Sequence, residues 1–351
     1  MAEPGVVTGE FQKAVEAEGL FTRRIHPADF STLGGNAAEC AGGPRAVKYG
    51  VTRDYVLGLE VVLPTGEIIE TGGQTAKGVV GYDLTRLIVG SEGTLGVITQ
   101  LILRLVPLPS HVRTMTVAYD RMEVAAETVS EIIRQGIVPR SIEYMDNAAI
   151  RCAEGYMKAG LPVDADAILI IEVDGTENEV DRAVQRVVAV CEKSGAREIK
   201  TAQTAEEAKA LWKARKSVSP ALFTYGPDKI NEDIVVPRSK IPDMVKKIRW
   251  ISQETGLTMV SFGHAGDGNI HVNIMLDKKD RKQRKKADQA VEDLFDYTLA
   301  LGGTISGEHG VGITKSAYMT KEISAASLDL MRRIKAAFDP AKILNPGKMR
   351  V

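Results

Sequence analysis

The sequence is poor in cysteine, and the few cysteines it has exclude two kinds of site. Only three occur among 351 residues, Cys40, Cys152 and Cys191, without C-x-x-C spacing. This number and spacing indicate neither a disulfide framework nor a cysteine-ligated zinc site, and they predict a reducing compartment. The chain also lacks an excess of charge of either sign, because it has 45 basic and 46 acidic residues. No basic stripe with interleaved aromatic residues is visible, which argues against nucleic acid as the main partner.

Long apolar runs and targeting signals are absent as well. The first residues, Met1–Gly5, are not a basic segment followed by an apolar one, and no apolar run approaches the ~20 residues of a membrane span. Hydrophobic residues nevertheless make up 44% of the chain, and its length suffices for about two domains with real cores. We therefore predict a soluble, cytoplasmic globular protein with no transmembrane segment.

Glycine and histidine are distributed unevenly. The first 107 residues contain 17 of the 33 glycines, and the remaining 16 are spread over residues 108–351. Only five histidines occur, yet His264, His271 and His309 fall within one short window. These two concentrations point to two functional regions in different parts of the chain.

The first third alternates short β-branched runs with glycine-rich turns, a pattern typical of small strands. Strands are predicted at Tyr55–Leu63, Ile68–Thr71 and Leu87–Val89, with one long strand or a strand pair over Leu95–Val106. The intervening Pro64-Thr65-Gly66 predicts a hairpin between the first two runs. Pro107 and Pro109 end the pattern, and the domain boundary is placed after residue 107, giving domains 1–107 and 108–351.

Strands alternate with amphipathic helices after this boundary. Val180, Val187 and Cys191 recur at helical spacing and predict a helix between Asn178 and Ser194. Further strands are predicted at Thr114–Ala118, Ala167–Val173, Asp233–Val236, Leu257–Phe262 and Ile270–Met275, and helices near 121–135, 204–216, 239–254, 279–300 and 323–337. The pattern indicates an α+β domain with a mostly antiparallel sheet covered by helices.

Two glycine-rich segments, Ser31–Gly43 and Val89–Ile98, are candidates for cofactor binding. Glycines let a backbone reach positive φ and approach a ligand closely, and exposed N–H groups bind phosphate oxygens, so a pyrophosphate cofactor suits them. The spacing of Gly90, Gly93 and Gly96 is neither a Rossmann fingerprint nor a P-loop. On composition alone, glycines that serve turns and bulges are an equally good interpretation.

These segments, with the strand and hairpin between them, resemble the vanillyl-alcohol-oxidase (PCMH-type) FAD-binding domain, and more closely its branch of GlcD-type glycolate oxidases and D-lactate dehydrogenases. The resemblance implies FAD rather than NAD, and a partial FAD-binding domain followed by an FAD-linked oxidase C-terminal domain. By this resemblance the cofactor-binding residues are Thr32, Gly34, Gly35, Asn36, Cys40, Gly42, Gly43, Gly90, Glu92, Gly93, Gly96, Ile98 and Asn345.

The sequence departs from that family in two places. Family members carry, upstream of the residues present here, a subdomain whose Arg-Gly-Gly-Gly-Thr-type loop holds the pyrophosphate. By this resemblance, we expect these residues to supply only half of the FAD cradle. Where they have an aromatic-Pro-Pro-Asp-Pro stretch, this chain has Phe21–Pro27, which a locally altered reading frame would explain. For this reason His26 is given no functional role.

The histidine-rich window predicts a strand, an Asp-Gly turn and a second strand over Ser261–Asn273. Alternation along a strand places His271 and Asn273 on one face, and the tight turn lets His264 reach the same site. Two imidazoles and one carboxylate are the composition of a catalytic divalent-metal site. Structural, partly buried histidines are the alternative.

The window Gly-His-x-Gly-Asp-Gly-Asn-x-His, with Glu-His-Gly-x-Gly farther on, is similar to the C-terminal domain of the same family. The resemblance implies a divalent metal (Zn, or Mn or Fe) on His264, His271 and Glu308, His309 as the catalytic base, Arg215 on the substrate carboxylate and Asn273 in contact with substrate. A basic residue at a helix end also occurs as a solvated charge, and this alternative stays open for Arg215. Asn231 stands where the 2-hydroxyglutarate branch has a lysine, which favours a short monoacid.

The function expected from these features is FAD-dependent oxidation of a small D-2-hydroxy acid, D-lactate or glycolate, to the 2-oxo acid. A metal would hold the substrate while a base takes the hydroxyl proton and hydride leaves for the flavin. The resemblance implies an electron-acceptor protein, an electron-transfer flavoprotein or an iron–sulfur subunit, and a homodimer is expected. The alternatives are a non-autonomous subunit or remnant that binds metal without a complete FAD site, and an oxidase of a different alcohol.

Overall fold

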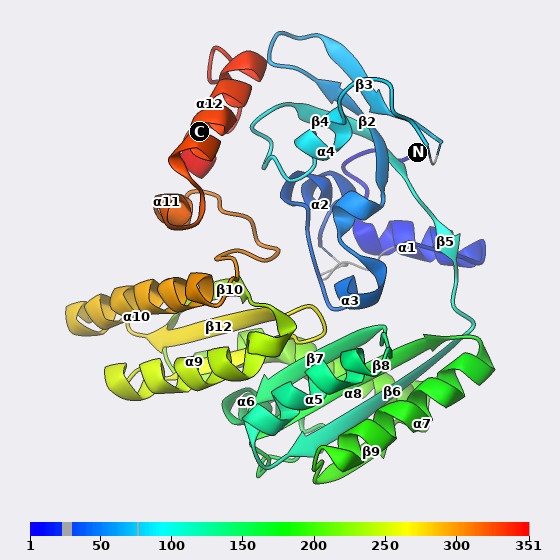
Figure 1. Cartoon of the computed structure of the whole chain (residues 1–351), viewed down its shortest axis with the longest axis vertical. Coiled ribbons are helices and arrows are strands. Elements are labelled where there is room, and N and C mark those ends of the chain that lie inside the picture. Colours follow the sequence, from blue (N-terminus) through cyan, green and yellow to red (C-terminus); the bar gives the residue numbers. More distant parts are fainter. Residues whose placement is uncertain (23–29, 76, 351) are drawn as a thin grey trace. The chain divides into compact units, whose positions relative to one another are not determined.

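The computed structural model describes residues 1–22, 30–75 and 77–350, and it divides into two compact units (Figure 1). The first unit comprises residues 1–45, 49–108 and 308–351, and the second comprises residues 46–48 and 109–307. The change of unit near residue 108 lies close to the boundary expected from the prolines. The last 44 or so residues, however, belong to the first unit and not to the second. His26 lies outside the described residues.

The first unit is built on a three-stranded antiparallel sheet in the order β3-β2-β4. The predicted hairpin is confirmed, since β2 (Val56–Val62) pairs with β3 (Ile68–Gly72) across the Pro-Thr-Gly turn. Leu59 and Leu101 pack in its core against α2 (Leu33–Glu39). The other elements of this unit are α1 (Thr8–Ala17), β1 (Leu20–Phe21), η1 (Thr52–Asp54), α4 (Leu84–Ile88), β4 (Val97–Leu103), β5 (Val106–Pro107), η4 (Ser316–Tyr318), α11 (Met319–Glu322), α12 (Ala325–Phe338) and η5 (Lys348–Arg350).

One strand predicted for this unit is wrong. The run Leu87–Val89 belongs largely to helix α4, because the side chain of Asp83 accepts a hydrogen bond from Arg86 N at 2.9 Å and caps the helix one turn earlier. A run of three apolar residues carries too little periodicity to distinguish the two structures. The run Leu95–Val106 forms two strands, β4 and β5.

The second unit contains a seven-stranded sheet in the order β10-β12-β11-β7-β8-β6-β9, with every neighbouring pair antiparallel. Its strands are β6 (His111–Tyr119), β7 (Ser141–Asp146), β8 (Ala167–Gly175), β9 (Glu198–Thr201), β10 (Asp228–Val235), β11 (Met259–His264) and β12 (Asn269–Leu276). The predicted α+β class and antiparallel sheet are confirmed. All strands predicted after residue 108 are present within a few residues.

Helices cover both faces of this sheet (Figure 1). On one face α6 (Asn147–Met157) and α8 (Ala205–Ala221) pack together against a core that includes Met145, Phe262 and Met275. On the other, α5 (Met122–Arg134), α7 (Glu177–Lys193), α9 (Ile241–Thr255) and α10 (Arg281–Ala300) form a layer in the spatial order α7-α5-α9-α10. The predicted helix at Asn178–Ser194 is α7. The remaining elements are α3 (Ala46–Tyr49), which spans a change of unit, η2 (Leu222–Thr224) and η3 (Arg238–Lys240).

Strand β7 and helix α6 were not predicted, although β7 is the central strand of the sheet. Its sequence, Ser-Ile-Glu-Tyr-Met-Asp, alternates polar and apolar residues over its first four positions, but the polar Ser141 and Glu143 are buried. Asp146 ends the strand and caps α6 by accepting a hydrogen bond from Ala149 N at 2.8 Å. A buried charge within a central strand does not match the apolar pattern by which such strands are recognised.

The register of the sheet decides which side chains share a face. Asp233 lies opposite His271, His271 lies opposite Phe262, and His264 lies opposite Glu143. Directly opposed residues of antiparallel strands point to the same side, and residues two apart in one strand do so as well. The predicted Asp-Gly turn between β11 and β12 is confirmed, and it brings both histidines to the face that α8 covers.

The turn itself depends on Gly268, and its replacement gives a measurable prediction. Gly268 has φ +90°, and a Cβ there would collide with the carbonyl oxygen of Val236. Gly256 also has positive φ, +67°, but a Cβ there has open space. Left-handed backbone costs an alanine about 1–2 kcal/mol. Gly268→Ala is therefore expected to lower the free energy of unfolding by more than Gly256→Ala does, as measured by urea denaturation; equal losses would contradict the close approach to Val236.

Candidate functional site

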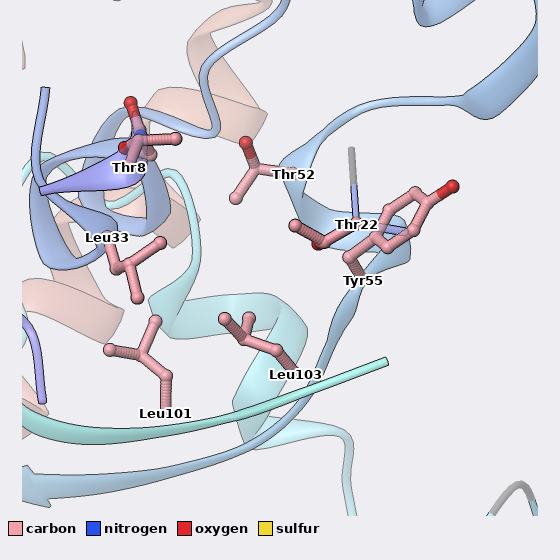
Figure 2. Close-up of a pocket in the computed structure, with 8 residues that line it drawn as sticks. Thr8, Thr22, Leu33, Thr52, Tyr55, Leu101 and Leu103 are labelled. Carbon is pink, nitrogen blue, oxygen red and sulfur yellow. The ribbon is translucent and has the colours of Figure 1, made fainter. Parts of the chain in front are cut away.

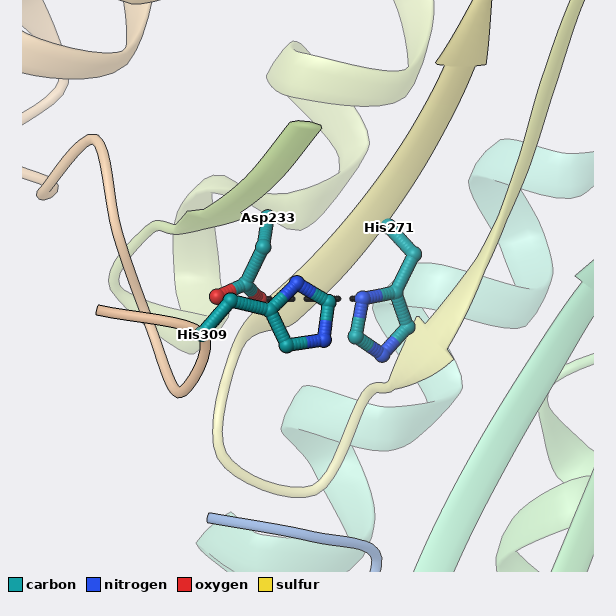
Figure 3. Close-up of side chains that lie close together, drawn as sticks. All are labelled: Asp233, His271 and His309. Atoms are coloured by element: carbon teal, nitrogen blue, oxygen red, sulfur yellow. Dashed lines mark ion pairs between the residues drawn. The ribbon is translucent and has the colours of Figure 1, made fainter. Parts of the chain in front are cut away.

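Two histidines of the second unit lie side by side, each with a carboxylate behind it. The rings of His264 and His271 stand edge to face with their centroids 5.2 Å apart, and their nearest ligand nitrogens lie within 4.8 Å of each other. Nδ1 of His264 lies 2.6 Å from Oε1 of Glu143. Nδ1 of His271 lies 3.6 Å from Oδ1 of Asp233, which Figure 3 marks as a dashed line.

This arrangement suits metal binding. A carboxylate only accepts hydrogen bonds, so Nδ1 of His264, at hydrogen-bond distance from Glu143, carries the proton; Nδ1 of His271 faces Asp233 at a longer distance. The other ring nitrogen, Nε2, then presents its lone pair, which is the form in which imidazole binds a metal. Histidine ligands in proteins almost always donate their second ring N–H to such a partner. The buried Asp233 is itself held by the amide of Asn269, whose Nδ2 donates to Oδ1 at 2.5 Å.

Glu143 is the buried charge at the centre of the cluster. Its side chain is 1% exposed, and its second oxygen, Oε2, lies 2.7 Å from Nη2 of Arg215. Burial acts to raise the pKa of Glu143, but the neighbouring His264 and Arg215 outweigh it and lower the pKa. Glu143 is thus a carboxylate that connects one predicted metal ligand to the predicted substrate anchor.

The predicted substrate residues, Arg215 and Asn273, carry unused hydrogen-bonding capacity in the same region. Arg215, from α8, stacks its guanidinium 4.6 Å above the ring of Phe262. Asn273, on β12 two residues beyond His271, is 1% exposed. Within the described part of the chain, three of their polar atoms have no hydrogen-bond partner: Nδ2 and Oδ1 of Asn273 and Nε of Arg215. Buried polar atoms without partners are rare and need an explanation, and a bound ligand supplies one.

In the first unit, the two glycine-rich segments lie next to each other. Gly90 N donates to Ala37 O at 2.9 Å, and Glu92 N donates to Ala38 O at 2.8 Å. Left-handed φ values occur in both segments, at Cys40, Gly90, Glu92 and Gly93. Segments that are about 50 residues apart in sequence therefore lie against each other, and both contain left-handed backbone of the kind found where a cofactor is bound through backbone groups.

Several predicted cofactor residues also have a structural task that the structure shows directly. Thr32 caps α2 by accepting from Gly35 N at 3.2 Å. The side chain of Asn36 donates to Thr8 Oγ1 at 2.7 Å, inside the unit. Gly34 and Gly96 are places of close packing, where a Cβ would collide with Pro4 and with Val61. Ile98 pairs with Val61 in the sheet.

A small cavity lies beside Asn36 (Figure 2). Leu33, Leu101 and Leu103 line it on one side, and the hydroxyl-bearing Thr8 and Thr52 line it elsewhere. Thr22, the last described residue before position 30, also lines it. None of the described residues that line this cavity is charged, so it offers little to hold a charged group.

Glu92 holds the segment 308–351 through hydrogen bonds. Its Oε1 accepts from Val311 N at 2.7 Å and its Oε2 from Gly312 N at 2.8 Å. Its backbone oxygen accepts from Nδ2 of Asn345 at 2.6 Å. Two residues predicted to bind cofactor, Glu92 and Asn345, thus hold residues 308–351 against the second glycine-rich segment.

Glu308 and His309 lie in this same unit, at the start of the returning segment. A Cβ on Gly42 would come within 2.7 Å of Glu308 Cβ, so the first glycine-rich loop approaches this residue closely. His309 Nε2 lies 3.9 Å from Glu308 Oε1. The preceding residue, Gly307, belongs to the second unit and donates its N–H to Asp233 Oδ2 at 3.0 Å.

A buried ion pair fixes the far end of the segment and predicts a pH dependence. Lys335 Nζ contacts Asp339 Oδ2 at 2.5 Å and donates to Thr94 O at 2.8 Å. Burial would raise the pKa of Asp339, but hydrogen bonds from Lys335 and from the N–H groups of Leu344 and Ile343 lower it to about 2. Because the folded protein lowers the pKa of Asp339 below its ordinary value of 3.8, the ionised carboxylate stabilises the fold at pH values above 3.8. This stabilisation is lost as the pH falls toward 2.

We therefore expect Asp339→Asn to melt at a lower temperature than the wild type at pH 6. The difference between the two proteins should narrow as the pH is lowered from about 4 to about 2, because the wild-type carboxylate is protonated over that range. Thermal unfolding followed by circular dichroism across this range measures it. A difference that stays constant with pH would contradict the assignment of the charge to Asp339.

Sequence reasoning missed Glu143 and Asp233. Neither lies in a glycine- or histidine-rich motif, and their strands carry no unusual spacing. One feature of the sequence could have identified them. Each is an acidic residue within an otherwise apolar strand, where a buried charge needs a partner.

Comparison with known families decides which family the chain belongs to. Residues 108–349 match the family described as FAD linked oxidases, C-terminal domain, and residues 1–72 match an FAD binding domain family. The chain belongs to the FAD-linked oxidases. It is thus a member of a flavoprotein family of oxidoreductases, as the motifs predicted.

Among curated relatives, glycolate oxidase subunit GlcD of Bacillus subtilis is 47% identical over 352 residues, covering 99% of this chain and 74% of that protein. GlcD of Escherichia coli is 37% identical and 69% of it is covered. The mitochondrial D-lactate dehydrogenase [cytochrome] of Arabidopsis thaliana is 35% identical, with 61% covered. The predicted branch of the FAD-linked oxidases is confirmed.

Solved structures show the same fold. The chain superposes on p-cresol methylhydroxylase with a TM-score of 0.81 at 17% identity, covering 99% of this chain and 75% of that one. It superposes on alkyldihydroxyacetonephosphate synthase with a TM-score of 0.68 and spans 62% of its length. None of the helices described for residues 1–22, 30–75 and 77–350 combines the length and apolar character that crossing a membrane requires.

Proposed function

We propose that this FAD-linked oxidase oxidises a small D-2-hydroxy acid, D-lactate or glycolate, to the corresponding 2-oxo acid. The observation that carries the proposal is the sheet face of the second unit. There, two imidazoles with a carboxylate beside each adjoin the buried Asn273, whose amide atoms have no hydrogen-bond partner among the described residues. A hydroxyl and a carboxylate on neighbouring carbons match this set of groups. The names of the relatives, which include a glycolate oxidase and a D-lactate dehydrogenase, favour the same substrate class.

We propose His264 and His271 as ligands of a divalent metal, Zn, Mn or Fe, because their Nδ1 atoms face carboxylates. Glu308 is proposed as the third ligand. It follows Gly307 in the chain, and consecutive Cα atoms are about 3.8 Å apart; the backbone of Gly307 is bonded to Asp233, the partner of His271. Such a metal, when bound, supplies Lewis-acid polarisation of the substrate hydroxyl.

The remaining steps belong to the side chains of this chain. Arg215 would hold the substrate carboxylate through N–H groups that Glu143 does not occupy, and Asn273 would hydrogen-bond to substrate oxygen. His309, next to Glu308, would take the hydroxyl proton on a ring nitrogen as the bond from the substrate carbon to hydrogen breaks. Removal of one proton and one hydride converts the hydroxy acid to the oxo acid.

The paired glycine-rich segments are proposed to hold FAD, which, when bound, supplies the hydride acceptor. The backbone of Cys40–Gly43 and Gly90–Gly93 would contact it, because both stretches contain left-handed residues and lie side by side. Thr32, Gly34, Gly35, Asn36, Gly96, Ile98, Glu92 and Asn345 would act by shaping these loops, through the contacts described above.

We further propose that electrons leave to an acceptor protein, an electron-transfer flavoprotein or an iron–sulfur subunit, and that the chain forms a homodimer in the cytoplasm. The word subunit in the names of the bacterial relatives supports a protein partner. The three cysteines are free thiols, in keeping with a reducing compartment.

One preparation tests the function. The purified chain is supplied with FAD and with Zn²⁺ or Mn²⁺, its absorbance near the flavin bands and its metal content are measured, and it is mixed with D-lactate or glycolate and a dye acceptor. Bound flavin, about one metal per chain and dye reduction by one of the two acids are expected. Metal without flavin would instead favour a non-autonomous metal-binding subunit, and flavin without metal would remove the ligand assignment.

A further inference from the structure

One carboxylate, Glu143, contacts both functional parts of the candidate site. It lies on the central strand of the seven, is 1% exposed, and uses its two oxygens for different partners. Oε1 lies 2.6 Å from Nδ1 of His264, and Oε2 lies 2.7 Å from Nη2 of Arg215. The proposed metal ligand and the proposed substrate anchor therefore depend on the same side chain.

We propose that Glu143 is a positioning residue that couples metal binding to recognition of the substrate carboxylate. It keeps the proton of His264 on Nδ1 and so presents Nε2 to the metal. At the same time it fixes one edge of the Arg215 guanidinium and leaves the other N–H groups for the substrate. This inference rests on the proposed function, and it adds a residue that does not touch the substrate itself.

The sheet register makes this dual contact possible. Glu143 is directly opposite His264, and Met145, two residues along β7, is opposite Phe262. Cζ of Arg215 lies 4.6 Å from the centroid of the Phe262 ring. The ring therefore packs against the face of the guanidinium, and the carboxylate of Glu143 binds its edge. Its Nε remains unpartnered among the described residues. A guanidinium held in two directions loses little freedom when it binds an anion.

Glutamine cannot replace Glu143 in this role. Its amide offers one accepting oxygen and one donating NH₂ group, whereas both His264 and Arg215 present donors. Either a donor then faces a donor, or the proton of His264 moves from Nδ1 to Nε2, the nitrogen proposed to bind the metal. The nearby Glu172 supplies a matched control, because it is also a buried carboxylate of this sheet but is bonded to Trp212 Nε1 at 2.8 Å and paired with Arg140 at 3.2 Å.

The test compares the full-length wild type with Glu143→Gln and Glu172→Gln. Zinc affinity is measured without substrate by competition with a chelator, and binding of D-lactate to the zinc-loaded protein is measured by calorimetry. Loss of a residue that orients a metal ligand typically weakens metal binding by about 10–100-fold. We expect Glu143→Gln to show this loss and to bind D-lactate more weakly as well, and Glu172→Gln to match the wild type in both.

The outcomes separate this inference from the proposed function. Wild-type protein that binds no zinc would overturn the proposed metal site and the inference with it. Zinc bound equally well by the wild type and Glu143→Gln would overturn the inference alone, and so would an equal loss in Glu172→Gln. Where Glu143→Gln fails to fold, ¹⁵N-histidine spectra of the metal-free wild type decide: His264 protonated on Nδ1 supports the inference, and His264 protonated on Nε2 overturns it.

Discussion

Replacement of His309 by alanine is expected to lower turnover of D-lactate or glycolate by about 10²–10⁴-fold, the contribution typical of a general base. Metal content should stay at the wild-type level, because His309 is proposed to take a proton and not to bind the ion. The side chain is 47% exposed, so its removal leaves no cavity in the core. Steady-state kinetics with a dye acceptor, together with metal analysis, measure both quantities.

A loss of turnover without a loss of metal is what identifies His309 as the base. Full activity in His309→Ala would refute the assignment of the base. Loss of metal together with activity would show that His309 is a ligand. Since Glu308 is the proposed third ligand, Glu308→Gln serves as the comparison, and it is expected to lose both metal and turnover.

Replacement of His271 by alanine is expected to remove the metal and, with it, activity by at least as large a factor. With one of two imidazoles gone, the remaining ligands hold a divalent ion much more weakly. The carboxylate of Asp233 keeps its bonds from Asn269 Nδ2 and Gly307 N, so the fold should be retained. Metal analysis after dialysis and circular dichroism test the two statements separately.

His111 offers the matched control in the same unit. It lies at the start of β6, where its Nδ1 is 3.1 Å from Ser110 Oγ, away from the histidine hairpin in the sheet order. His111→Ala should keep wild-type metal content and turnover. Retention of metal by His271→Ala, or its loss by His111→Ala, would contradict the site.

Local chain geometry predicted the two histidines of the hairpin, whereas Arg215 on α8 was predicted only from the resemblance to the family. An Asp-Gly turn and strand alternation suffice to bring His264 and His271 together, and both act within about ten residues. Glu143 depends instead on the pairing of β7 with β11, which are about 120 residues apart in sequence. The resemblance predicted that Asn345 returns to the FAD-binding domain. The return of the rest of residues 308–351 to the first unit was not predicted, because it rests on single contacts such as that of Lys335 with Thr94.

Glu92 and Val311 are separated by 219 positions in the sequence, and this separation constrains how the molecule is made. During synthesis the second unit, whose main segment is continuous from residue 109 to 307, emerges complete before the last segment of the first unit exists. Domains generally fold as units during translation. The second glycine-rich segment therefore remains without its contacts to Val311 and Gly312 until the whole main segment of the second unit has been synthesised.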